Sequence, residues 1–441
     1  MLNKLAILGG QKAITKDPED MFLWPIVTDE DEKAVLQVIR DRAMSGTEIT
    51  KTFEKEFSIW QGSKYTLGCN NGTAALQLAM YGCGVGRGDE IICPSVTYWA
   101  TCLQVFSLGG TIVFADIDSN TLCINPDDIE HRITKKTKAI VVVHYLGYPC
   151  DMDRIMEIAK KYNIKVIEDV SHAQGGYYKG KKVGSIGNVG AMSLMSGKSF
   201  AIGEAGMLVT DDVEIYERAV SFGHYSRYNG FETEYLKEFE GLPLGGFKYR
   251  MHQASAAMGR VQLKYYDQRM AEINKAMNYF WDGLEGTCGI RAIRPKKGSG
   301  STMAGWYVSA GRYYPEKLKG LSVTRFCNAL KAEGVNTSPG CNKPLHTHAM
   351  LHNADIYNDG KPTRIANSTY DLREGDKSLP VSENIATIVF KAPWFKHFRP
   401  QIIDEYIDAY KKVCNNYKEL LDGDEGNSKN LGGWNFFNSA H

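Results

Sequence analysis

The feature of this chain that most restricts its fold is an alternation of apolar, β-type runs with helical stretches between residues 52 and 211. The run at 139–144 is nearly unbroken valine and isoleucine, which is typical of a parallel strand covered by helices on both faces. Met152, Ile155 and Ala159 follow at helical spacing and predict a helix whose apolar stripe lies on the sheet. The alternation therefore predicts an α/β fold with a mainly parallel sheet.

The length of 441 residues is too great for one small core, so we expect a large unit and a smaller one. A long helical stretch beginning near residue 252 suggests a hinge. We place the large unit, with an N-terminal arm, at 1–265 and a smaller C-terminal unit at 266–421. Polar, Gly- and Asn-rich sequence then predicts a flexible tail at 422–441. We also expect a loop at 223–247, strands near 306–311 and 388–391, and helices near 322–333 and 401–421.

Charge and cysteine content narrow the class of protein. The 52 Lys and Arg residues balance 51 Asp and Glu residues, so charge gives no reason to expect nucleic acid or an anionic membrane as a partner. No apolar window approaches the roughly 18 residues of a transmembrane helix, and the N-terminal apolar patch is too short for a signal peptide. Ten cysteines are scattered singly, without CxxC pairs. We therefore expect a protein of the reducing cytoplasm.

Lys198 has an unusual setting for a charged residue. It lies in MSLMSGKSFAIGEAGMLVTDD, flanked by Met, Gly, Ser and Phe and followed by an apolar strand. A lysine in such a low-dielectric place has a lowered pKa and can act as an imine-forming nucleophile. The ordinary alternative is an exposed loop lysine, and the Gly-rich surroundings argue against it.

Asp169 ends a predicted strand at 164–169. Ligands of open parallel sheets collect beyond the carboxyl ends of the strands, so this carboxylate should face the crevice. Glu168 should point to the opposite face of the sheet and is expected to be structural. A metal site of Asp169 with His172 is the alternative. No third ligand stands at nearby spacing, so we favour a cofactor role and expect no metal.

Two further segments could serve a planar, anionic ligand. The turn NNGT at 70–73 offers a helix N-terminus, a glycine for close approach and a hydroxyl, although an ordinary capped turn has the same residues. Tyr98 and Trp99 follow another strand, where an aromatic pair more often belongs to the core. Together with a carboxylate and a lysine amine, these are the groups that pyridoxal phosphate requires of a protein.

Several motifs follow one another along the chain: NNGTAALQLA, GDEIICPSVTYWAT, VFADID, IEDVSHAQGGYYKGKKVGSIG, the SxxxxK spacing of Ser193 and Lys198, GEAGMLVTDD and YRMHQASAAMGRVQL. In order and spacing they resemble the DegT/DnrJ/EryC1/StrS family of sugar aminotransferases, over about residues 24–413. Each motif is weak alone, but the set is specific. The resemblance implies fold type I of the pyridoxal-phosphate enzymes, the aspartate-aminotransferase-like architecture, with a large domain and a smaller C-terminal α/β domain.

The resemblance also implies a role for each candidate residue. Lys198 resembles the lysine that forms the Schiff base with pyridoxal phosphate and then serves as general base and acid. Asp169 resembles the partner of the pyridine nitrogen. The remaining implied ligands are Tyr98 and His172 beside the cofactor ring, and Gly72, Thr73 and Ser193 at its phosphate.

Two positions depart from the family pattern. Lys248 stands where the family usually has an asparagine before Tyr-Arg-Met, which contacts the cofactor phosphate from the neighbouring subunit. An ammonium could do so as a point charge, or Lys248 could contact an anionic group on the substrate. Met195 replaces a polar residue often seen three positions before the lysine, which removes one polar contact near the substrate.

The implied reaction is a transamination in two half-reactions, with ping-pong kinetics. L-Glutamate or L-glutamine gives up its amino group, and a keto-sugar or keto-cyclitol receives it, in the biosynthesis of amino sugars, antibiotics or surface glycans. The resemblance further implies a homodimer with shared active sites. His346, His348 and Tyr357 lie in a segment that borders the active-site mouth in relatives. They are candidates for substrate contact, and ordinary loop residues are the alternative.

Other functions occur on the same fold. Some relatives aromatise an aminoshikimate-type ring with the same lysine, as 3-amino-5-hydroxybenzoate synthases do. Relatives that dehydrate sugars at C-3 carry histidine where Lys198 stands, which argues against that reaction. A non-catalytic ligand sensor of this fold tends to lose the lysine or the aspartate, and this chain keeps both Lys198 and Asp169.

Overall fold

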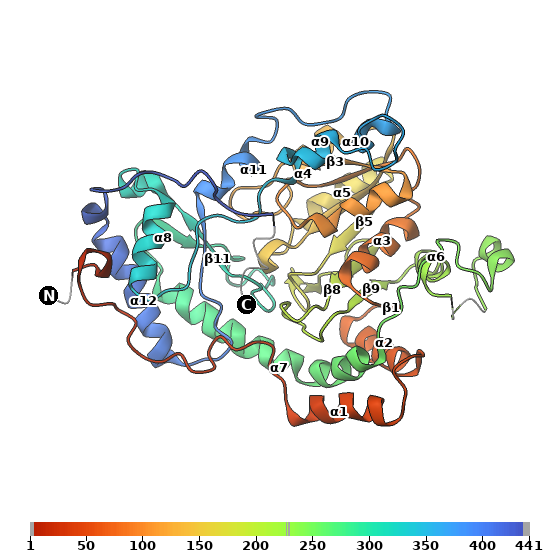
Figure 1. Ribbon diagram of the computed structural model, residues 1–441, viewed down its shortest axis with the longest axis horizontal. Coiled ribbons are helices and arrows are strands. Elements are labelled where there is room, and N and C mark those ends of the chain that lie inside the picture. Colours follow the sequence, from red (N-terminus) through yellow and green to blue (C-terminus); the bar gives the residue numbers. More distant parts are fainter. Residues whose placement is uncertain (1–3, 226, 228–229, 435–441) are drawn as a thin grey trace.

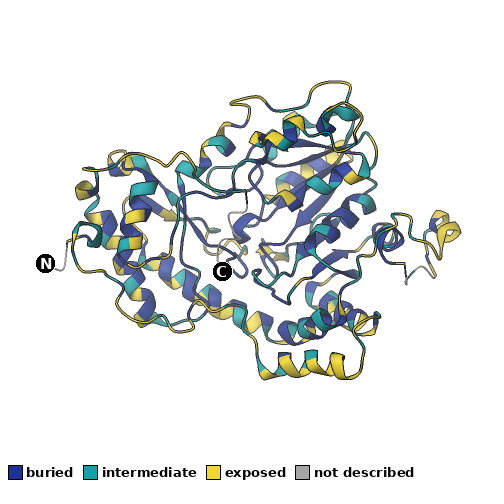
Figure 2. Cartoon of the chain, viewed as in Figure 1, coloured by how far each residue is buried: buried dark blue, intermediate teal, exposed yellow. Residues whose placement is uncertain are grey.

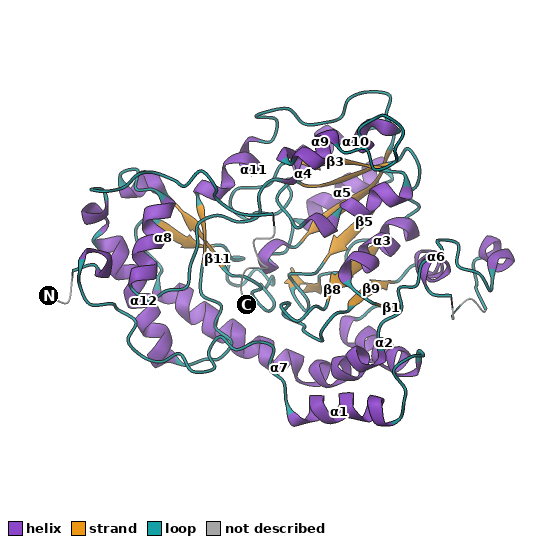
Figure 3. Ribbon diagram, in the orientation of Figure 1, coloured by secondary structure: helices purple, strands orange, loops and turns teal. Residues whose placement is uncertain are grey.

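The computed structural model describes residues 4–225, 227 and 230–434. At its centre lies a seven-stranded sheet in the order β1-β9-β8-β5-β4-β2-β3 (Figure 1, Figure 3). The pairs from β8 to β3 are parallel, whereas β9 is antiparallel to both of its neighbours. The prediction of an α/β fold with a mainly parallel sheet is therefore confirmed. The strands are β1 (Tyr65–Cys69), β2 (Glu90–Pro94), β3 (Thr111–Ala115), β4 (Thr137–Val143), β5 (Lys165–Asp169), β8 (Val189–Ser193) and β9 (Gly206–Thr210).

Both faces of this sheet are covered. Alternate residues of β4 enter two different apolar cores. Ile140 and Val142 lie in one core, and Ala139 and Val141 lie in the other. The strands are accordingly buried (Figure 2), while the outer side of α1 (Asp29–Arg40), which packs on α7, is exposed. The helices around the sheet are α2 (Glu48–Gln61), α3 (Gly72–Gly82), α4 (Pro126–Arg132), α5 (Met152–Tyr162), α6 (Val213–Gly223) and the first part of α7 (Gln253–Gly283).

The predicted apolar stripe is found on α5. Met152, Ile155 and Ala159 are buried in the core beneath the sheet. The side chain of Asp151 accepts a hydrogen bond from the amide of Arg154 and caps the start of the helix. The helix ends at Asn163, whose φ of 55° is left-handed.

The C-terminal part of the chain forms a second, smaller layer of helices on a three-stranded antiparallel sheet. The expected strand near 306–311 begins only at residue 310. Trp306 and Val308 have left-handed φ values of 54° and 50°, so the chain turns there instead of extending. The elements of this part are β10 (Ile290–Ala292), β11 (Ala310–Tyr313), β12 (Val389–Lys391), α8 (Val323–Ala332) and α12 (Pro400–Asn415).

Two segments pack on a different unit from the one to which the sequence analysis assigned them. Near the N-terminus, the amides of Ala6 and Ala13 donate to the carboxylate of Glu333, at 2.8 Å each, so the arm packs on the smaller unit. The segment with α9 (Ala349–Asn353), α10 (Thr363–Ala366) and α11 (Pro380–Asn384) covers the edge strand β3 (Figure 1). There Arg364 donates to the carbonyl of Ile112 at 2.8 Å. The boundary near 265 falls inside α7 and stays a prediction.

The segment after residue 421 contacts the body over its described part. Asp424 accepts hydrogen bonds from the amide and the hydroxyl of Ser322, at 2.7 and 2.6 Å. The ring of Trp434 lies edge-on to His348, 4.6 Å between centroids. Residues 435–441 of the predicted tail lie outside the described residues. Within the part of the chain that the structure describes, no helix combines the length and the apolar character that a membrane crossing requires.

Candidate active site

A cavity of about 650 Å³ lies beyond the carboxyl ends of the central strands. β5 ends in Asp169 and β8 ends in Ser193, and both residues line this cavity. The topology of a parallel sheet thus brings residues from distant strands to one edge, as predicted. Of the eight residues predicted for cofactor binding and catalysis, seven line it: Gly72, Thr73, Tyr98, Asp169, His172, Ser193 and Lys198.

Lys198 is buried beside this cavity, with a fractional exposure of 8%. Its ammonium nitrogen lies 4.2 Å from the ring centroid of Tyr307. Its backbone carbonyl accepts a hydrogen bond from the indole N–H of Trp24 at 2.8 Å, which fixes the loop after β8. Burial lowers the pKa of Lys198 to about 8, against the charge of Asp169, which raises it. About a tenth of the amine is therefore neutral, and nucleophilic, at pH 7, far more than for a solvated lysine.

Asp169 is held as an acceptor by two donors. The hydroxyl of Thr101 donates to Oδ2 at 2.9 Å, and the amide of Ser171 donates to Oδ1 at 3.0 Å. Its neighbour Glu168 points to the other face, as predicted from strand alternation. There it accepts from the amide of Gly184 at 2.8 Å and lies 2.9 Å from Nε2 of the buried His144. The chain thus separates a structural carboxylate from one that faces the cavity.

His172 is buried against aromatic rings and carries no formal charge at neutral pH. Its ring centroid lies 4.6 Å from that of Tyr307. Its Nδ1 accepts the amide N–H of Leu146 at 3.3 Å. Burial, and after it the charge of Lys198, lowers the pKa of His172 well below its ordinary value. Among the described residues, no group of three or more His, Cys, Asp or Glu side chains is placed to hold a metal ion.

The N-terminus of α3 points its first turn at the cavity. Asn71 caps the helix by accepting the amide of Ala74 at 2.8 Å, while the first amides of a helix have no intrahelical acceptor. Gly72 is required here by close packing on β8. A Cβ atom at this position would stand 2.6 Å from the Cβ and 2.7 Å from the Cα of Ser193. This contact brings the helix end, Thr73 and Ser193 together in a cradle suited to an anion.

Tyr98 lines the cavity and is half-buried, whereas its neighbour Trp99 is 37% exposed. Their rings lie 5.0 Å apart at their centroids. Of this aromatic pair, only Tyr98 therefore faces the site.

Met195 also lines the cavity, and its sulfur accepts the amide of Gly197 at 3.0 Å.

Of the eight residues predicted for cofactor binding and catalysis, only Lys248 does not line the cavity of its own chain. It is exposed, and its nitrogen lies 5.9 Å from the ring of Tyr225. It forms a single antiparallel bridge with His224. The carbonyl of the next residue, Tyr249, accepts a hydrogen bond from the amide of Asn70 at 2.8 Å. This segment therefore runs beside the turn before α3.

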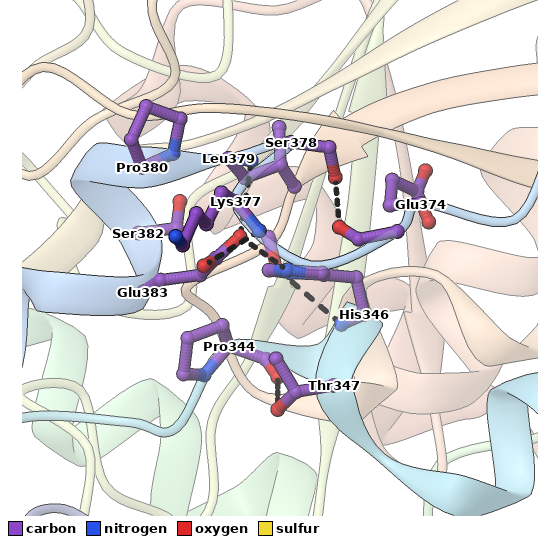
Figure 4. A network of polar contacts seen from close by, with 12 residues as sticks. Pro344, His346, Thr347, Glu374, Lys377, Ser378, Leu379, Pro380, Ser382 and Glu383 are labelled. Atoms are coloured by element: carbon purple, nitrogen blue, oxygen red, sulfur yellow. Dashed lines mark hydrogen bonds and ion pairs between the residues drawn. The ribbon is translucent and has the colours of Figure 1, made fainter.

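His346, His348 and Tyr357 do not line the cavity either. Figure 4 shows His346 in a polar network with Glu383, with 3.4 Å between Nε2 and the carboxylate; its Nδ1 lies 2.6 Å from the hydroxyl of the fully buried Ser95. His348 caps α9, and the hydroxyl of Tyr357 donates to the carbonyl of Phe106 at 2.5 Å. Within one chain, His346 and Tyr357 hold the 344–384 segment on the large unit, whereas His348 contacts its own segment and Trp434.

Sequence reasoning missed several residues that line the cavity. Trp24, Tyr307 and Lys396 were not among the predicted residues, and folding brings them to the cavity that holds Lys198. Thr101 could have been predicted from the sequence, because it ends the GDEIICPSVTYWAT motif, three residues after Tyr98.

The sequence profile of the DegT/DnrJ/EryC1/StrS aminotransferase family matches residues 25–409. Over 397 residues the chain is 37% identical to the spore coat polysaccharide biosynthesis protein SpsC of Bacillus subtilis, covering 88% of this chain and 95% of that protein. It is 33% identical over 339 residues to the L-glutamine:2-deoxy-scyllo-inosose aminotransferase of Streptomyces kanamyceticus, covering 74% and 78%. A solved aminotransferase from Psychrobacter cryohalolentis has a similar fold, with a TM-score of 0.76 at 29% identity and coverage of 90% and 99%. The chain belongs to the DegT/DnrJ/EryC1/StrS aminotransferase family.

Proposed function

We propose that this protein transfers the amino group of L-glutamate or L-glutamine to a keto-sugar or keto-cyclitol, with pyridoxal phosphate as its cofactor. The observation that carries the proposal is the placement of the Lys198 amine, buried and with a pKa of about 8, in one cavity with Asp169 and the N-terminus of α3. An amine, a carboxylate acceptor and an anion cradle are what this cofactor needs.

The residues present fit pyridoxal phosphate by their chemistry. The cradle of Gly72, Thr73 and Ser193 would hold the phosphate. Asp169, kept as an acceptor by its two donors, would hold the protonated pyridine nitrogen. Tyr98 and His172 would lie against the ring, and Lys198 would bind the aldehyde carbon.

When bound, pyridoxal phosphate supplies an electron-accepting ring conjugated to the nitrogen being transferred. Lys198 supplies the proton chemistry. Once the donor has displaced it, Nζ would take the proton from the α carbon of the amino acid and deliver it to the former aldehyde carbon of the cofactor. In the second half-reaction Nζ would take that proton from the same cofactor carbon and deliver it to the acceptor carbon that receives the amino group. The hydrogen bond from Trp24 and the ring of Tyr307 hold the amine in position for both steps. His172 stays neutral, so it adds no positive charge that would compete with the pyridine nitrogen for Asp169.

The substrate class rests on the relatives. The Bacillus subtilis protein is named for spore coat polysaccharide biosynthesis and the Streptomyces kanamyceticus enzyme for a cyclitol ketone and L-glutamine. A keto-sugar or a keto-cyclitol as acceptor, and an amino acid of the glutamate type as donor, are consistent with both. We further propose a cytoplasmic enzyme, which is supported by ten unpaired cysteines, nine of them buried.

The direct test uses absorbance of the purified protein reconstituted with pyridoxal phosphate. Adding L-glutamate or L-glutamine should bleach the long-wavelength band, and adding a keto-sugar or keto-cyclitol should restore it. Lys198→Ala should show neither change, whereas Lys411→Ala, at an exposed position on α12, should behave as wild type. A wild-type protein that binds the cofactor but bleaches with neither donor would contradict the proposal. An aromatic product from a ring substrate would favour the aromatising reaction instead.

We propose that the protein is a homodimer in which Lys248 serves the partner's site. Its exposure, and its absence from the cavity of its own chain, support this assignment. Mixed dimers of Lys198→Ala and Lys248→Ala chains test it, because one of the two sites would then be intact. Recovery of activity on mixing two impaired proteins is expected. No recovery would place Lys248 in its own site or outside catalysis.

A further inference from the structure

The cavity around Lys198 contains two more lysines, which the proposed reaction does not use. Lys391 ends β12, and Lys396 follows after the turn that contains Trp394. Both line the cavity, and Lys396 has a fractional exposure of only 3%. Among the described residues, no carboxylate lies within ion-pair distance of either amine. Lys residues are rarely buried to this degree unless they are paired.

Aromatic side chains enclose Lys396. Its amine lies over the ring of Trp394 and 5.2 Å from the ring centroid of Trp24. Both indoles are fixed by hydrogen bonds to backbone carbonyls, Trp24 to Lys198 at 2.8 Å and Trp394 to Gly305 at 2.7 Å. These bonds make the enclosure rigid and tie one of its walls to the loop of Lys198.

The same aromatic wall links the two buried amines. Lys198 lies over Tyr307, and the Tyr307 ring meets Trp394 edge to face, with 5.7 Å between centroids. Trp394 in turn lies under Lys396. One substrate molecule in this cavity can therefore react at Lys198 while another part of it reaches Lys396.

The burial of this amine without a carboxylate partner is the feature that needs an explanation. Burial, reinforced by the nearby charge of Lys391, lowers the pKa of Lys396 well below its ordinary value. The aromatic faces stabilise a cation without neutralising it. A bound anion would offset both the burial and the repulsion between the two lysines.

We propose that Lys396, assisted by Lys391, forms a subsite for an anionic group of a substrate, a carboxylate or a phosphoryl group. The inference deepens the proposed transamination and rests on it for the identity of the ligand. A carboxylate would come from the amino-acid donor, and a phosphoryl group from a phosphorylated or nucleotide-linked acceptor. Lys396 then decides which molecules enter the site with their reacting group at Lys198.

Calorimetric titration of the cofactor-bound protein tests the subsite with two unreactive probes, glutarate and inorganic phosphate. Lys396→Met keeps the length of the side chain and removes the charge, and Lys411→Met is the matched surface control. Loss of one charge-assisted contact should weaken binding of one or both probes about ten- to hundredfold. The control should leave affinity unchanged. A loss confined to glutarate assigns the subsite to the donor carboxylate, and a loss confined to phosphate assigns it to the acceptor.

Equal affinities of wild type and Lys396→Met for both probes would overturn the proposal, as would a wild type that binds neither. If Lys396→Met does not fold, Lys396→Arg and Lys391→Met replace it. Retained binding in the arginine variant and weakened binding in Lys391→Met are expected, and unchanged binding in Lys391→Met would overturn the assisted subsite. The probes do not react, so their binding can be measured even if the protein transfers no amino group. Failure of the subsite and failure of the proposed transamination can therefore be distinguished.

Discussion

Replacement of Gly72 by alanine tests how the anion cradle is built. The added Cβ would stand 2.6 Å from the Cβ, 2.7 Å from the Cα and 2.8 Å from the backbone nitrogen of Ser193. Two of these atoms belong to the backbone of the central strand β8, so they cannot rotate away as a flexible side chain would. The residue has no left-handed φ, and the effect is therefore purely one of space.

The expected magnitude follows from this contact. Overpacking of a buried site costs about 1–3 kcal/mol, and we expect a loss of that size in the free energy of unfolding. The helix end must also move away from Ser193, which should weaken the hydrogen bonds to the cofactor phosphate. A loss of about 1–3 kcal/mol there corresponds to a roughly ten- to hundredfold weaker binding of pyridoxal phosphate.

Urea unfolding of the cofactor-free protein and an absorbance titration with pyridoxal phosphate measure the two effects. Gly375→Ala is the control, because no atom lies within 4 Å of an added Cβ there and its φ is not left-handed. The reasoning is refuted if Gly72→Ala unfolds and binds the cofactor like the control. Weaker cofactor binding at unchanged stability would show that the glycine serves the ligand and not the packing.

Four other perturbations probe the neighbouring groups. Capture of pyridoxal phosphate by Lys198 should accelerate as pH rises through about 8, because only the neutral amine attacks the aldehyde; stopped-flow absorbance measures it, and a flat profile would contradict the buried-amine account. In Asp169→Asn the midpoint should move to lower pH, since the aspartate raises the pKa of that amine; an unmoved midpoint would separate the two residues. Thr101→Val should weaken cofactor binding about tenfold, and Thr101→Ser much less, because the hydroxyl donates to Asp169 at 2.9 Å. Glu168→Gln should lower the free energy of unfolding by about 3 kcal/mol, because an amide cannot accept from the donors around both carboxylate oxygens. If Glu168→Gln unfolds at the same free energy as wild type, Glu168 has no structural role.

The sequence predicted the central sheet well because its signal is local. Strands buried on both faces read as continuous apolar runs, and the apolar stripe of α5 has a regular period. The same topology predicted that Asp169 would face the crevice, since ligands of parallel sheets collect beyond the carboxyl ends of the strands. The resemblance to the family, and not the topology, implied that Lys198 serves the same site. The opposite faces of Asp169 and Glu168 followed from simple alternation along β5.

Long-range packing was not predictable in the same way. The turn at Trp306 and Val308 depends on left-handed backbone angles that neither residue signals. Tyr307 and Lys396 reach the cavity from the smaller unit, and only long-range packing brings them there. His346 had two alternatives, substrate contact or an ordinary loop residue, and the structure buries it between Ser95 and Glu383, away from the cavity.

The central claim is that Lys198 is the amine that binds the cofactor. Borohydride reduction of the protein with pyridoxal phosphate, followed by peptide mass spectrometry, tests it most directly, because reduction makes the bond permanent. The account predicts a pyridoxyl adduct on the peptide that contains Lys198, and none on that peptide after Lys198→Ala. An adduct found instead on Lys396, the other buried lysine of the cavity, or no adduct at all, would contradict it.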